Sequence, residues 1–174
     1  MPKRHTLPRL WLMTDERMGD RLLPSIAALP KRSGIIFRHY SLPNQERRAL
    51  FAIVKKLARR RCHCLIVAGS MKLRGDGVHG RNAKRTHAIK TVPVHSVRDI
   101  VAAQQSGADL LFISPLFATM SHQGEMTLGR IRFGMMSRSA KTPVIALGGM
   151  TKLRAKSLKT MGLYGWAAID SLTV

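Results

Sequence analysis

The feature that most constrains the fold is an alternation of short apolar runs with amphipathic stretches along nearly the whole chain. A continuous apolar run of this length is typical of a strand that is buried on both faces. Amphipathic stretches with helical spacing follow the first, second, fifth, sixth and seventh runs. Strands that alternate with helices predict a parallel sheet. The predicted strands are 9–15, 33–40, 63–69, 76–80, 90–95, 108–117, 142–149 and 164–172.

Eight such strands predict a closed (β/α)8 TIM barrel that occupies a single domain, residues 1–174. The connections are unequal in length. Only residues 70–75 separate the third strand from the fourth, only 81–89 separate the fourth from the fifth, and two residues follow the eighth. We therefore expect a trimmed barrel with several outer helices shortened or missing. An open flavodoxin-like sheet is the alternative fold.

The chain is strongly basic, with 30 Lys and Arg against 9 Asp and Glu and a formal net charge of +21. Such a surface attracts anionic ligands or acidic partners over a Debye length of about 8–10 Å, although it is also a general solubility trait. The cations are spread from Lys3 to Lys159, and aromatic residues are few. Because stacking platforms for bases are not evident, we do not expect nucleic acid as a partner.

The sequence predicts a cytoplasmic protein without a membrane partner. No apolar run approaches the roughly 20 residues of a membrane span, and the N-terminus lacks a signal-peptide cleavage pattern. Two cysteines cannot form a disulfide framework. The stretch Cys62-His63-Cys64 offers metal-binding atoms, but alternation along a strand turns His63 away from both thiols, so no zinc site is expected there.

In a barrel of this class, ligands bind at the carboxyl ends of the strands, and phosphate often binds after strands seven and eight. Gly148 and Gly149 end the seventh apolar run. Paired glycines either make a tight turn or let a ligand approach the backbone N–H groups. The helix that begins after Thr151 would add its dipole, and Ser171 would donate a hydroxyl from the eighth strand. We therefore predict a small phosphorylated ligand at this edge.

Five motifs in consecutive order carry a resemblance to a known family: "LWLMTD", "DGVHG", "VPVHS", "SPLFATMSHQG" and "TPVIALGGM". They resemble the strand motifs of thiamine phosphate synthases and their thiazole tautomerase (TenI-like) relatives, over almost the whole chain. The resemblance implies the barrel fold, a pocket for thiazole phosphate and, in the synthase, a site for a pyrimidine diphosphate with Mg²⁺. In the synthase reaction the thiazole nitrogen displaces diphosphate from the pyrimidine methylene.

Several positions match the family's functional residues. The resemblance implies that Arg38 binds the diphosphate as the catalytic arginine. Two strand-end histidines also match, although each is equally consistent with a core or rim histidine; these are His79 and His95. The residues that the resemblance assigns to the thiazole phosphate are Thr119, Ser121, Gly148, Gly149 and Ser171.

Other positions depart from the family pattern. Where the family has an Asn-Asp pair that supplies a Mg²⁺ ligand, this chain has Ala68-Gly69. The family's second metal-binding aspartate would fall within residues 80–84, which hold no carboxylate in this chain. At the positions of two family lysines this chain has Tyr40 and His122. At the position of the tautomerase histidine that moves a proton, it has Pro115. His122 remains a candidate contact residue. Since Mg²⁺ requires hard oxygen ligands, we expect no metal site.

Two hypotheses follow for the function. In the first, the chain is a thiamine phosphate synthase-like transferase that joins thiazole phosphate to hydroxymethylpyrimidine diphosphate. In the second, it is a catalytically degenerate member that binds a phosphorylated ligand or an acidic partner. The missing carboxylates favour the second, and very low or no synthase activity is expected. Because outer helices are missing, apolar barrel wall would be exposed, which favours a homodimer.

Overall fold

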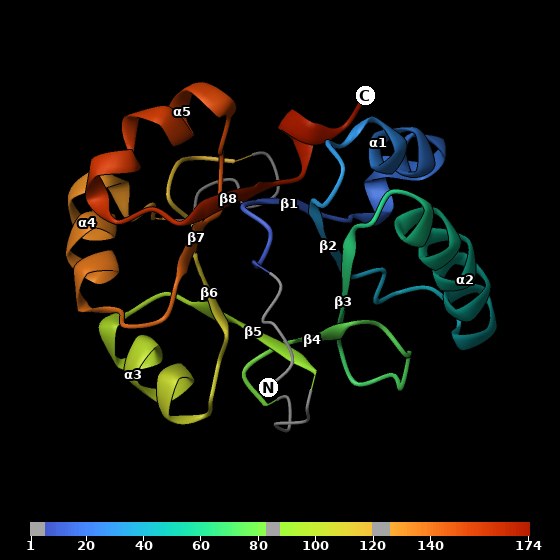
Figure 1. Ribbon diagram of the computed structural model, residues 1–174, viewed down its shortest axis with the longest axis horizontal. Helices are drawn as coiled ribbons and strands as arrows, with labels where there is room; N and C mark the ends of the chain where they lie inside the picture. Colours follow the sequence, from blue (N-terminus) through green and yellow to red (C-terminus); the bar gives the residue numbers. More distant parts are fainter. Residues whose placement is uncertain (1–5, 83–87, 120–125) are drawn as a thin grey trace.

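The structure is a computed structural model that describes residues 6–82, 88–119 and 126–174, and its eight parallel strands close into a barrel in chain order (Figure 1). The barrel closes where β1 pairs with β8, with Leu10 opposite Trp166. The predicted barrel is therefore confirmed, and the open sheet is excluded. The strands are Leu10–Met13 (β1), Gly34–Phe37 (β2), Cys64–Ala68 (β3), Gly77–His79 (β4), Ile89–Val94 (β5), Leu110–Ile113 (β6), Val144–Ala146 (β7) and Gly165–Ala168 (β8).

Five α-helices cover part of the barrel, after the strands for which the sequence predicts them. In the part of the chain that the structure describes, no helix follows β3 or β4, and a single 3-10 turn follows β8. Figure 1 shows the resulting helix-free sector outside β4. No helix in the described ranges is both long and apolar enough to cross a membrane. The helices are Leu22–Ala28 (α1), Asn44–Arg60 (α2), Val97–Gln105 (α3), Gly129–Ser139 (α4) and Lys152–Ser157 (α5).

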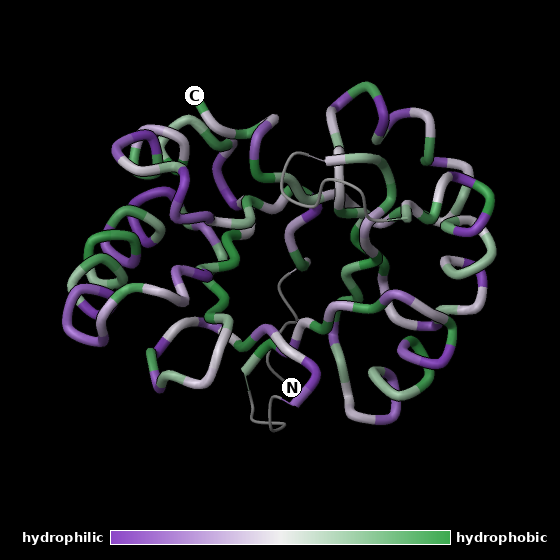
Figure 2. Tube along the Cα trace, turned by 180° about the vertical axis from the view of Figure 1, so that it is seen from behind, coloured by the Kyte–Doolittle hydropathy of each residue, from purple (hydrophilic) through white to green (hydrophobic). Residues whose placement is uncertain are grey.

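The strands separate two apolar layers because successive side chains point to opposite faces. One set fills the barrel interior, including Trp11, Ile66 and Phe112, with the Trp11 and Phe112 rings edge to face at 5.6 Å. A Cβ at Gly34 would overlap the Trp11 indole, so the glycine makes room for that ring. The other set packs under the helices. Figure 2 shows the ring of strands as mainly hydrophobic, whereas the outer helices alternate in hydropathy.

The sequence predicts a helix that is capped by Ser96 and has Val97, Ile100 and Val101 on its inward face. The start of this helix, α3, is confirmed, but part of the predicted inward face is wrong. The Ser96 side chain accepts a hydrogen bond from the Asp99 N–H and so caps the helix. Ile100 is buried as expected, whereas Val97 and Val101 are 48% and 47% exposed. The helix rests on the barrel along a narrow line that passes through Ile100, and both valines lie on its flank.

Candidate ligand-binding site

A cavity of about 290 Å³ lies at the carboxyl ends of the strands. Its wall comes mainly from the segments that follow β6, β7 and β8, with Arg38 reaching it from the end of β2. The sequence-predicted site residues that line it are Arg38, His95, Thr119, Gly148, Gly149 and Ser171. Two further predicted contacts, Ser121 and His122, lie outside the described residues.

The glycine pair after β7 is required by the packing of the protein itself. Gly148 and Gly149 have φ angles of 98° and 58°, a region that L-residues rarely adopt. A Cβ at Gly148 would lie 2.8 Å from the Leu116 nitrogen, and one at Gly149 would lie 2.4 Å from the Ala118 carbonyl oxygen. The tight turn alone therefore explains why both positions are glycine, without any contact with a ligand.

The same glycines nevertheless offer donors to the cavity they line. Among the described residues, neither the Gly148 nor the Gly149 N–H donates a hydrogen bond to a protein acceptor, whereas the Gly148 carbonyl accepts one from Phe117. Successive residues with positive φ bring neighbouring N–H groups together, as in backbone anion sites. The predicted helix dipole is a smaller contribution, because α5 has six residues.

The Ser171 hydroxyl differs from the expectation that it donates to the ligand. The Ser171 hydroxyl donates to the Met150 carbonyl at 2.7 Å, so the atom it presents to a ligand is an oxygen acceptor. The predicted N-cap of the following helix is confirmed, since Thr151 accepts from the Arg154 N–H. Thr119 lines the cavity beside these residues.

Arg154 and Asp170 line the cavity as well, and the sequence reasoning missed both. The Arg154 guanidinium lies 4.6 Å from the centre of the Phe117 ring and donates to the Gly149 carbonyl oxygen. The one sequence signal was position: Arg154 is in the first turn after the glycine pair, and Asp170 directly precedes Ser171. The cavity therefore combines two guanidinium groups with a carboxylate.

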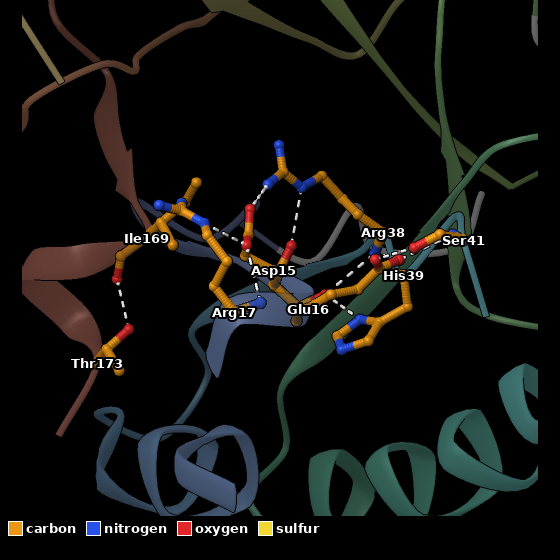
Figure 3. Close-up of polar contacts among 9 residues, drawn as sticks. Asp15, Glu16, Arg17, Arg38, His39, Ser41, Ile169 and Thr173 are labelled. Atoms are coloured by element: carbon orange, nitrogen blue, oxygen red, sulfur yellow. Dashed lines mark hydrogen bonds and ion pairs between the residues drawn. The ribbon is translucent and has the colours of Figure 1, made fainter. Parts of the chain in front are cut away.

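Arg38 is fixed at the mouth of β1 and β2 by a carboxylate and a carbonyl (Figure 3). Its Nη2 lies 2.5 Å from the Asp15 Oδ2, and its Nε donates to the Thr14 carbonyl at 2.8 Å. Burial alone would raise the pKa of Asp15, but hydrogen bonds from Arg17 and the charge of Arg38 hold it below its usual value. Arg38 is thus ion-paired within the protein, and it shares the Asp15 carboxylate with Arg17.

The loop after β2 is held against the segment after β1. Glu16 accepts hydrogen bonds from both the backbone and the hydroxyl of Ser41, and these bonds lower the pKa of Glu16 (Figure 3). His39 stacks on Phe37 and lies 3.0 Å from the Thr14 hydroxyl, and burial lowers its pKa. These contacts fix the backbone from which Arg38 extends.

The two candidate histidines have different surroundings. His79 on β4 contacts the Thr91 hydroxyl at 2.8 Å and the edge of Phe112 inside the barrel. Burial, with a smaller contribution from Arg38, lowers the pKa of His79 to about 4, so this imidazole is neutral at neutral pH. His95 is exposed, lines the cavity and donates its Nδ1 proton to the Ser114 carbonyl at 2.6 Å. Only His95 is positioned to contact a ligand in the cavity.

The corner where the family places its metal aspartate is occupied by a cation. Arg47 of α2 is 4% exposed, and its Nη2 donates to the carbonyls of Arg38 and Ala68. A Cβ at Gly69 would lie 3.3 Å from the Tyr40 ring and 3.5 Å from the Arg47 Nη2, with φ at 90°. The described residues also contain no group of three or more His, Cys, Asp or Glu side chains arranged to hold a metal. The residues present do not fit Mg²⁺.

A closed parallel barrel with a cavity at the carboxyl ends of its strands defines the class of (β/α)8 ligand-binding and catalytic domains. Within that class, the family model described as thiamine monophosphate synthase matches residues 11–172. The chain belongs to this family, as its motifs predict.

Three similar proteins illustrate the relationship. The putative thiamine-phosphate synthase 2 of Aquifex aeolicus is 27% identical over 94% of this chain and 97% of its own length. The thiamine biosynthesis bifunctional protein ThiED of Geobacter sulfurreducens is 26% identical, and the match covers 36% of that longer protein. The solved thiamine phosphate pyrophosphorylase of Pyrococcus furiosus superimposes with a TM-score of 0.79 at 23% identity, over 94% of this chain and 86% of that one. That structural likeness supports the fold.

Proposed function

We propose that this protein binds a thiazole phosphate-type ligand in the cavity at the ends of β6, β7 and β8. The observation that carries the proposal is the Gly148-Gly149 turn, which lines the cavity with two backbone N–H groups that no described protein acceptor uses. Family membership supports the ligand class, because the matching family is the thiamine monophosphate synthases.

In this proposal the phosphoryl oxygens accept hydrogen bonds from the glycine N–H groups and the Thr119 hydroxyl. Ser171, whose proton is donated to Met150, accepts from a protonated phosphoryl oxygen or a bridging water. The heterocycle lies toward Arg38 and His95, which line the same cavity.

Synthase turnover is the second candidate function, and one observation favours it: Arg38, the diphosphate-binding arginine of the resemblance, lines the same cavity. Two observations oppose it. The Arg47 guanidinium and the Tyr40 ring occupy the corner beside Gly69, and Arg38 already pairs with Asp15. Charge that develops on a departing diphosphate would lack the preorganised stabilisation on which such a reaction depends. We therefore propose phosphorylated-ligand binding with very low or absent transfer activity.

The test is calorimetry and an activity assay on the same purified protein. Thiazole phosphate should bind at least about tenfold more tightly than the unphosphorylated thiazole alcohol, since charge-assisted hydrogen bonds are lost with the phosphate. Incubation with thiazole phosphate and hydroxymethylpyrimidine diphosphate in Mg²⁺ should yield no thiamine phosphate. Equal affinities for the two thiazoles contradict the binding proposal. Turnover on the order of 1 s⁻¹ that is lost on chelation contradicts the inactive assignment.

A further inference from the structure

The two arginines of the cavity differ in how their charges are balanced. Arg38 is paired with Asp15 at 2.5 Å, and the Asp15 side chain is only 16% exposed. Arg154, by contrast, has no carboxylate within ion-pair distance among the residues that the structure describes. Arg154 therefore contributes the guanidinium charge of the cavity wall that the protein itself does not neutralise.

The Arg154 guanidinium is held in place although the side chain is exposed. Its plane is positioned over Phe117, with 4.6 Å between Cζ and the ring centre, and its Nη1 donates to the Gly149 carbonyl oxygen. An arginine on an aromatic ring gains cation–π stabilisation and loses rotational freedom before any ligand arrives. Binding an anion then costs less side-chain entropy than it would with a free surface arginine.

Gly149 is part of the same arrangement. A Cβ at this position would lie 3.0 Å from the Arg154 Nη1 and 3.0 Å from the Phe117 Cβ. The missing side chain thus allows the guanidinium to approach the turn whose N–H groups remain free of protein acceptors. Cation and backbone donors border one part of the cavity.

We infer that Arg154 is the principal anion anchor of the cavity and the residue that makes binding depend on the ligand's phosphate. This inference rests on the proposed function, because it assigns a further contact to the same site. One Nη1 hydrogen bond goes to Gly149, and the other guanidinium N–H groups match the spacing of two phosphoryl oxygens. A phosphate monoester is the ligand class that fits, since it presents a charged, multi-oxygen end.

The experiment compares substitutions of two neighbouring cations on α5. Arg154→Gln and Lys152→Gln each remove one positive charge from an exposed position, but only Arg154 lines the cavity. Affinity for inorganic phosphate is measured by calorimetry at low ionic strength. Arg154→Gln should weaken binding about tenfold or more, because a charge-assisted hydrogen-bonded contact is lost. Lys152→Gln should weaken it by less than about threefold through the general field.

Two more variants examine the preorganised geometry. Arg154→Lys keeps the charge but not the planar fork, so its phosphate affinity should lie between those of the wild type and Arg154→Gln. Phe117→Leu removes the ring beneath the guanidinium and should weaken phosphate binding several-fold. Thermal unfolding curves for each variant establish that the fold is retained, and a variant that unfolds early is compared at a temperature where it is folded.

The outcomes separate this inference from the proposed function. If Arg154→Gln and Lys152→Gln lose equal affinity, or neither loses any, the anchor assignment is overturned while thiazole phosphate binding by the wild type stands. If the wild type binds inorganic phosphate through Arg154 but discriminates against thiazole phosphate, the anchor stands and the proposed function fails. A wild-type protein that binds neither ligand overturns both.

Discussion

The Arg47 Nη2 lies 2.6 Å from the Ala68 carbonyl oxygen and 2.8 Å from that of Arg38. One guanidinium thus joins the carboxyl ends of β2 and β3. Among the described residues the Arg47 Nε has no hydrogen-bond partner, and the aromatic rings of Phe37 and Tyr40 lie 5.6 Å and 5.8 Å from the Arg47 Cζ. A buried cation without a carboxylate is costly unless its hydrogen bonds are good, so this contact must stabilise the strand ends.

Arg47→Met should lower the free energy of unfolding by about 1–3 kcal/mol, because two carbonyls at the strand ends lose their donor while most of the side-chain volume is kept. Urea unfolding followed by circular dichroism measures the change. Arg48→Met, at the adjacent and exposed position on α2, is the control and should change stability by less than about 0.5 kcal/mol. If Arg47→Met is as stable as the wild type, the free-energy cost of burying the guanidinium equals the stabilisation from its hydrogen bonds, and the predicted loss is contradicted.

Asp15 should make stability depend on acid pH. Burial opposes its ionised form, but the Arg17 and Arg38 contacts outweigh burial and lower its folded-state pKa below the ordinary aspartate value of 3.8. A lowered carboxyl pKa stabilises the fold above the unfolded-state pKa, and this stabilisation is lost as pH falls through the folded-state pKa. The unfolding free energy, measured from pH 6 down to about pH 2, should therefore fall less steeply in Asp15→Asn. An identical acid limb in both proteins contradicts this.

The barrel and its strand-end cavity could be predicted because both depend on local patterns. Eight apolar runs predict the eight strands. Because ligands bind at the carboxyl ends of the strands in such a barrel, residues as distant in sequence as Arg38, His95 and Ser171 can be assigned to one cavity. The predicted bounds of the strands are less accurate. The predicted strand 108–117 is β6, Leu110–Ile113, since the chain leaves the ladder before Pro115.

Other parts of the site could not be predicted because they depend on where long side chains reach. Arg47 belongs to a helix whose periodicity indicates only that the position faces inward, and no pattern encodes its contact with two strand-end carbonyls. In the sequence Arg154 cannot be distinguished from the many other surface cations. The structure distinguishes it by placing the Phe117 ring, from a different loop, against its guanidinium. In the sequence the glycine pair is consistent with a tight turn or with a ligand at the backbone, and only the structure shows how closely the Ala118 carbonyl approaches Gly149.

His79 should contribute a pH dependence of the same sign as that of Asp15, at higher pH. Its folded-state pKa of about 4 lies below the ordinary histidine value of 6.5, so between these values the unfolded chain binds the proton and the native state does not. Stability should consequently rise as pH increases from 4 to 6.5. His79→Gln should reduce that slope by up to about one proton, or 1.4 kcal/mol per pH unit. NMR of the imidazole provides a direct check, and a midpoint near 6.5 would contradict the burial argument.

The sequence predicts a homodimer at micromolar concentration, and we expect it to form at the sector outside β4, which no described helix covers. With a net charge of +21 on each chain, like-charge repulsion should oppose association most strongly at low ionic strength. Light scattering across a salt series should therefore show the mass rising from that of one 19.4 kDa chain toward twice that value as salt is added. A single-chain mass at every salt concentration rules the dimer out.

Asp170 should limit the affinity of the cavity for anions. Its carboxylate lines the same cavity as Gly149 and Arg154, and a like charge near a bound phosphate is unfavourable, although solvent and the nearby charge of Arg17 reduce the effect. Asp170→Asn preserves the shape of the side chain and removes its charge, so inorganic phosphate should bind about two- to fivefold more tightly by calorimetry.

The matched control is Asp20→Asn, which makes the same change in net charge at an exposed carboxylate that does not line the cavity. Because only a short-range effect distinguishes the two, Asp20→Asn should leave affinity nearly unchanged, and the gain in Asp170→Asn should shrink as salt is raised. If both variants gain equally, the net charge of the chain rather than Asp170 sets the affinity; if Asp170→Asn binds phosphate more weakly, the carboxylate supports the site instead of opposing the anion.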